Sequence, residues 1–146
     1  MKRLMPVLAY AVVVTASGYV PALAAPSPCA LATSAQVSAA AGQPVGSGTT
    51  TGPLGSVCEW RAESDSSIYV NIQRFDKHYW SPERMADGYR TISGIGEKAF
   101  AVPELGGWKA CALAGKNVVC VNMSGGRASA AAASALLKTS LQRIGT

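Results

Sequence analysis

Apolar and polar residues alternate in the middle of the chain, and this alternation predicts a β-sheet. Between Ile68 and Phe75, apolar residues take every second position as far as Ile72, with more polar residues between them. A period of two is expected of a strand that buries one face. Shorter strand-like segments at 59–61, 99–102, 110–113 and 118–121 complete a predicted sheet of about five strands.

Apolar residues at helical spacing predict helices around these strands. The strongest pattern covers 129–144, where the predicted apolar stripe is Ala130, Ala133, Leu137, Leu141 and Ile144. The tetrapeptide TSAQ at 33–36 has the form of a capping box and begins a shorter helix, which Gly42 and Pro44 end. The tripeptide SPE at 81–83 has the residue types of a helix start and predicts a third helix running to about Arg90.

The remaining segments are predicted to be turns and loops. Residues 64–67, SDSS, form a hairpin turn, and residues 46–56, GSGTTTGPLGS, have no apolar periodicity and are predicted to be a flexible loop. The resulting order of helix, strands, helix, strands, helix favours an antiparallel α+β fold, with helices packed on the sheet, over a parallel α/β fold.

Residues 1–24 have the three parts of a secretory signal peptide. Lys2 and Arg3 precede a long apolar run, and the small residues of Ala22-Leu23-Ala24 follow it, so cleavage is expected after Ala24. A membrane-spanning helix is the alternative, but prolines and a Ser-Gly pair interrupt a stretch barely long enough to span a bilayer. We therefore expect residues 25–146 to be one secreted or periplasmic domain with no stable membrane insertion.

The four cysteines of such an exported chain predict two disulfide bonds. Cys29, Cys58, Cys111 and Cys120 allow three pairings. A two-residue turn at 115–116 places Cys111 opposite Cys120 as a non-hydrogen-bonded pair, with Cα atoms about 4.5 Å apart, which a disulfide can bridge. This leaves Cys29 to pair with Cys58. A four-cysteine zinc site is disfavoured because the sequence has no C-x-x-C motif.

Length, composition and charge exclude several functional classes. A chain of 146 residues, 49% hydrophobic and 14% charged, is neither a multidomain enzyme, a collagen, a coiled coil nor a disordered tail. The formal net charge of +5 becomes +3 when Lys2 and Arg3 leave with the leader. The other basic residues are dispersed, so nucleic acid is not an expected partner. A weak attraction to acidic cell-envelope polymers is compatible with this charge.

Three short motifs carry a resemblance to a family. The sequences PCAL at 28–31, CEW at 58–60 and GIGEKA at 94–99, followed by a hairpin and a C-terminal helix, are similar to those of small secreted and lipoprotein-type bacterial proteins of unknown function, which resemble PsbP-like α/β/α sandwiches. The resemblance implies an antiparallel sheet with helices and a Cys29–Cys58 bond, and it implies no activity. The chain departs from the family in lacking an anchoring cysteine and in having the pair Cys111 and Cys120.

Candidate catalytic chemistry depends on His78, the single histidine. A serine hydrolase would use it as the base, with Asp76 or Asp87 nearby, but the sequence has no G-x-S-x-G motif. The glycines of GIGEKA match a dinucleotide fingerprint, yet a strand is predicted after them where that motif needs a helix. We therefore expect no catalytic residue, cofactor or metal; the alternative is a small hydrolase-type enzyme that uses His78.

The densest aromatic stretch, FDKHYW at 75–80, is the candidate binding surface. The candidate binding residues are Phe75, His78, Tyr79 and Trp80. Loops on a rigid scaffold commonly carry recognition, and Tyr and Trp are frequent in binding hot spots. The alternative is that Trp80 folds inward and caps the core, because a small domain tends to bury its large aromatic residues. The expected function is that of an exported binding or accessory protein, whose partner is a protein or a cell-envelope component.

Overall fold

The structure of the protein is a computed structural model that describes residues 24–145. The predicted signal peptide, apart from its last residue, lies outside the described residues. The elements in chain order are η1 (Pro28–Ala30), α1 (Ser34–Ala41), β1 (Thr49–Thr51), η2 (Pro53–Gly55), β2 (Val57–Arg61), β3 (Tyr69–Asp76), η3 (Lys77–Tyr79), β4 (Arg90–Ile92), β5 (Lys98–Glu104), β6 (Gly107–Ala114), β7 (Asn117–Ser124) and α2 (Ala130–Gln142), where η denotes a short 3-10 turn.

The strands form one antiparallel sheet in the order β1-β2-β3-β7-β6-β5-β4. This confirms the predicted antiparallel α+β fold, but the sheet has seven strands rather than about five. The two additional strands are the edge strands. β1 lies inside the segment predicted to be a flexible loop, and β4 begins where the third helix was expected to end. Each has three residues, too few to show an alternating pattern, and each forms because the neighbouring strand supplies hydrogen-bond partners.

The third predicted helix is absent, and this prediction was wrong. Residues 81–89 form turns and irregular structure, and Gly88 has a φ of 76° within them. The Glu83 carboxylate pairs with Lys109 of β6 instead of serving a helix N-terminus. A segment this short forms a stable helix only when it buries an apolar stripe. Here Met85 remains 97% exposed, while Ala86 and Tyr89 pack against the sheet.

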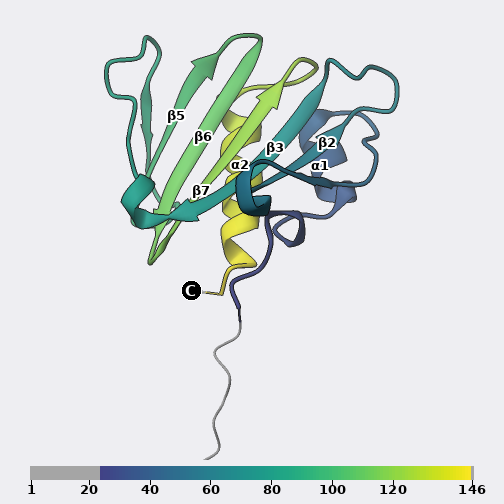
Figure 1. Ribbon diagram of the computed structural model, residues 1–146. Helices are drawn as coiled ribbons and strands as arrows, with labels where there is room; N and C mark the ends of the chain where they lie inside the picture. The colour runs from purple at the N-terminus through teal and green to yellow at the C-terminus, as the bar shows by residue number, and fades with distance from the viewer. Residues whose placement is uncertain (1–23, 146) are drawn as a thin grey trace, which may run out of the picture.

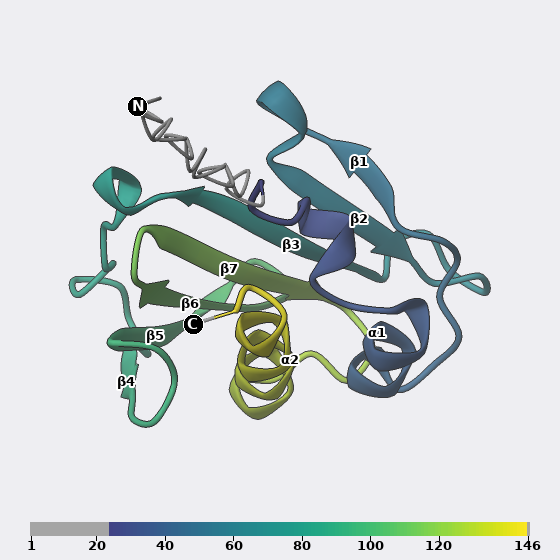
Figure 2. The ribbon, with the colours of Figure 1, turned by 90° about the horizontal axis from the view of Figure 1, so that it is seen from below.

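Both α-helices pack on one face of the sheet, which we call the helix face; α2 runs behind the sheet in Figure 1, and both helices lie on one side of it in Figure 2. Strands β5 and β6 present small side chains to α2, namely Ala99, Ala101, Ala110 and Ala112, all buried. Small side chains let the helix approach the sheet closely, and the larger residues of α2 fill the space between them. The main core therefore lies between α2 and the middle of the sheet.

The N-terminal caps of both helices follow the local sequence. Thr33 and Gln36 complete the predicted capping box of α1, and Gly42 ends that helix in the left-handed conformation. Ser129 caps α2 through a 3.0 Å bond from the Ala132 backbone N–H. The buried face of α2 is Ala133, Leu136, Leu137, Ser140 and Leu141, whereas the predicted stripe members Ala130 and Ile144 are only half-buried. The face includes Leu136 because α1 packs beside α2.

Disulfide bonds join Cys29 to Cys58 and Cys111 to Cys120, as predicted. The two-residue turn between β6 and β7 has the expected register, which pairs Cys111 with Cys120 at a Cα separation of 4.1 Å. Because all four thiols are oxidised, they form no zinc site. Within the described part of the chain, no helix combines the length and apolarity needed to cross a bilayer.

Candidate functional site

The second face of the sheet, which we call the open face, carries no α-helix formed by residues 24–145. Its β5–β6–β7 half is covered by the segment after η3, where Trp80 packs edge-on against Phe100 with ring centroids 5.5 Å apart. Tyr89 stacks on the same ring at 5.4 Å. With Val102, Val118 and the Cys111–Cys120 bond, these rings form a second and smaller apolar cluster. The irregular segment thus covers this half of the open face, as α2 covers the helix face.

A cavity of about 320 Å³ opens between this segment and the sheet, and we call it the aromatic pocket. Its floor is the Cys111–Cys120 disulfide with Phe100 and Val118, and its walls include Phe75, Tyr79 and Trp80. Its polar lining consists of Gln73, Ser81, Glu83 and Lys109. This volume is at the lower end of the range of small-ligand sites, which are typically apolar cavities with a few polar groups.

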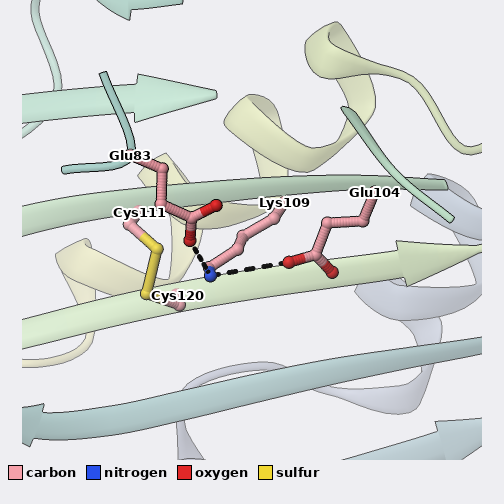
Figure 3. Close-up of polar contacts among 5 residues, drawn as sticks. All are labelled: Glu83, Glu104, Lys109, Cys111 and Cys120. Carbon is pink, nitrogen blue, oxygen red and sulfur yellow. Dashed lines mark hydrogen bonds and ion pairs between the residues drawn. A yellow bond between two sulfur atoms is a disulfide. The ribbon is translucent and has the colours of Figure 1, made fainter. Parts of the chain in front are cut away.

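Lys109 is the central polar group at the pocket. Its ammonium lies between two carboxylates, 2.5 Å from Glu83 Oε1 and 3.5 Å from Glu104 Oε1, beside the disulfide (Figure 3). Burial lowers the pKa of Lys109, but the hydrogen bond and charge of Glu83, with those of Glu104, outweigh burial and leave the pKa raised. The side chain therefore stays charged, and it ties the irregular segment to β6.

Two asparagines on the open face lie in one cross-strand row with Lys109. Their side-chain oxygens have no hydrogen-bond partner among the described residues. Asn71 of β3 pairs across the strands with Asn122 of β7, and Asn122 pairs with Lys109. The Oδ1 atoms of both asparagines are buried, and no described residue donates to them. Neither asparagine lines the aromatic pocket, so this polar row lies beside the cavity.

The structure separates the four predicted binding residues. Phe75, Tyr79 and Trp80 line the aromatic pocket, and His78 does not. Trp80 folds inward onto Phe100, as the alternative interpretation held, whereas Tyr79 is 71% exposed and lies against Phe75 with ring centroids 6.0 Å apart. The aromatic stretch is therefore partly core and partly a pocket wall.

His78 lies on the outside of η3. Its side chain is 81% exposed, and its Nδ1 hydrogen-bonds the Asp76 carboxylate. The backbone N–H of His78 and then its ring hold the pKa of Asp76 below the usual value. Over residues 24–145, no serine or threonine hydroxyl hydrogen-bonds His78, and every cysteine is in a disulfide. The structure thus supplies the base and carboxylate of a hydrolase without an adjacent nucleophile.

Several pocket residues escaped the sequence analysis. Gln73, Glu83 and Lys109 were not predicted as site residues, although one signal for Lys109 was present. Lys109 precedes Cys111 by two positions in the same strand, so strand periodicity puts both on one face. The pairing of Lys109 with Glu83 had no local signal, because 26 positions separate them.

The GIGEKA motif forms a turn between two strands. Gly94 and Gly96 have positive φ angles, and a Cβ at Gly96 would lie 2.5 Å from the Leu113 carbonyl oxygen. Strand β5 follows directly, so no helix N-terminus faces this turn to hold a pyrophosphate. The glycines are explained by the turn itself.

Comparisons of the chain with models of protein families, with curated proteins and with solved structures found no match.

Proposed function

We propose that this protein is an exported binding protein that takes a flat apolar group, such as an aromatic ring, into the aromatic pocket. The observation that carries the proposal is the pocket's composition: an apolar floor, aromatic walls and a charged group held at one side. Such a site fixes a ring by contact area and orients it through polar groups. The ring belongs to a small molecule or to a cell-envelope partner.

Binding without chemistry is favoured because the two charged residues that line the pocket, Lys109 and Glu83, are paired with each other. Lys109 is paired with Glu83 and Glu104, and His78 lies outside the cavity. A general base must reach the proton that it removes, whereas His78 does not line the pocket and its side chain is 81% exposed.

Export is part of the proposal, and the disulfides support it, since such bonds persist mainly in oxidising compartments. We expect the protein recovered from outside the cytoplasm to begin at or near Ala25. Mass spectrometry of the intact secreted or periplasmic form measures this directly. Retention of residues 1–24 in the exported form would contradict it.

The pocket can be tested with N-phenyl-1-naphthylamine, a neutral aromatic probe that fluoresces more strongly in apolar surroundings. We expect saturable binding to the unchanged protein. Gln73→Trp, which fills the pocket from β3, should weaken binding at least about tenfold, and Tyr79→Ala, which removes a wall, about fivefold to tenfold.

The matched control is His78→Ala, which changes an exposed neighbour of Tyr79 that does not line the cavity. It should bind the probe like the unchanged protein. Tyr79→Ala should also keep nearly the same melting temperature, because exposed side chains contribute little to stability. Absence of saturable binding, or equal binding by Gln73→Trp and the unchanged protein, would show that the proposed function is wrong.

A further inference from the structure

A second cavity, of about 470 Å³, lies on the other side of Tyr79, and we call it the Arg74 groove. Most of its lining is apolar: Pro28, Pro53, Leu54, Phe75 and Tyr79. Arg74 of β3 is the charged residue among the lining residues. Phe75 and Tyr79 line both cavities and divide the groove from the aromatic pocket.

Arg74 carries an unmatched positive charge in this groove. Its Nε atom is buried and has no hydrogen-bond partner, and Arg74 makes no ion pair with any residue from 24 to 145. A buried donor on a cationic group is unfavourable without an acceptor, so proteins usually pair it. On the neighbouring strand β2 the pairing is present, since Arg61 bonds Glu59 at 2.7 Å. The groove therefore lacks an acceptor at Arg74.

The rim of the groove exposes apolar side chains on both sides. Leu54 of η2 is fully exposed, and Tyr79 of η3 is 71% exposed. Leu54 also has a φ of 54°, a left-handed conformation that is costly for a residue with a branched side chain. Such local strain is concentrated at binding and catalytic sites. In Figure 2, η2 lies at the end of the β1–β2 hairpin and η3 at the end of β3, both at a distance from α2.

From these observations we propose that the Arg74 groove binds a small organic carboxylate with an aliphatic body. A carboxylate matches the planar fork of a guanidinium and accepts two parallel hydrogen bonds from it. The aliphatic body would lie along Pro53, Leu54 and Tyr79 and remove their apolar surface from water. A single arginine balances the single charge of a carboxylate, whereas a phosphate monoester brings more charge than the groove matches.

Octanoate is a suitable probe because it combines one carboxylate with a short aliphatic chain. Titration followed by backbone amide chemical shifts should show saturable binding in the millimolar range expected of so small a ligand. The shifts should be largest around Leu54, Arg74 and Tyr79. Octan-1-ol, which has the chain without the charge, should bind at least about tenfold more weakly. Octyl phosphate should bind no more tightly than octanoate.

Arg74→Gln should weaken octanoate binding at least about tenfold, and Arg74→Lys, which keeps the charge and loses the fork, should have an intermediate effect. The matched control is Arg84→Gln, an exposed arginine that does not line the groove, and it should bind octanoate normally. If Arg74→Gln does not fold, Arg74→Lys and the ratio of octanoate to octanol affinity in the unchanged protein decide the question.

The proposal is wrong if octanol binds as well as octanoate, if both Arg74 variants bind octanoate like the unchanged protein, or if octyl phosphate binds more tightly. It does not depend on the aromatic pocket. Arg74→Gln should still bind N-phenyl-1-naphthylamine, and Gln73→Trp should still bind octanoate, so failure of one site is distinguishable from failure of the other.

Discussion

Leu137→Asp is expected to lower the free energy of unfolding by about 4 kcal/mol or more. Leu137 is 0% exposed in α2, packed within the main core. The substitution removes a buried leucine and places a carboxylate among the buried apolar side chains of the main core. Loss of this much free energy is a large fraction of the stability of a domain this size. Leu141→Asp, at 7% exposure, should also be strongly destabilising.

Urea denaturation followed by circular dichroism measures the change. Lys138→Asp is the matched control, because it introduces the same side chain one position along α2 on the exposed face. It should change the free energy of unfolding by less than about 1 kcal/mol. Similar denaturation curves for Leu137→Asp and Lys138→Asp would contradict the packing of α2 on the sheet.

Removal of the Cys29–Cys58 bond by replacing both cysteines with alanine is expected to cost about 3.6 kcal/mol, from the chain entropy that a loop of this length restrains. The bond ties η1 to β2, and Cys58 is 0% exposed, so truncation there also removes core contacts. A small domain depends on such cross-links because its core is limited in size.

The Cys111–Cys120 bond closes a shorter loop within a hairpin that is already paired along its length, and its removal should cost about 2.7 kcal/mol. Melting temperatures of the two double-alanine variants can be compared directly with that of the unchanged protein. A larger loss for the hairpin variant would contradict the expectation that the length of the closed loop sets the effect of each bond.

Local sequence was sufficient wherever a structural element is specified by residues within about ten positions of each other. The TSAQ capping box of α1 and the register that pairs Cys111 with Cys120 both belong to this class. In each case the interacting groups are close in sequence, so residue type and spacing determine the geometry. The pairing of Cys29 with Cys58 then followed by elimination.

The segment 81–89 shows where local signals were insufficient. Its first three residues favour a helix start. In the structure, however, Glu83 forms an ion pair with Lys109 of β6, and Tyr89 stacks on Phe100 of β5. These tertiary contacts outweigh a helix-start preference of about 1 kcal/mol. The edge strands β1 and β4 also depend on tertiary contacts. Each consists of three exposed or half-exposed residues, which form a strand only because they pair with a neighbouring strand.

The sequence by itself determined the antiparallel α+β class, the two disulfides, the capping box of α1 and the aromatic content of residues 75–80. Tertiary structure alone decided which of those aromatic residues line a cavity, that Lys109 and Glu83 meet beside the disulfide, and that Arg74 lies unpaired in a groove. The physical reason is distance along the chain: a cavity is made of side chains from several strands and turns. Its shape depends on how the sheet and the covering segment pack, which residue periodicity does not encode.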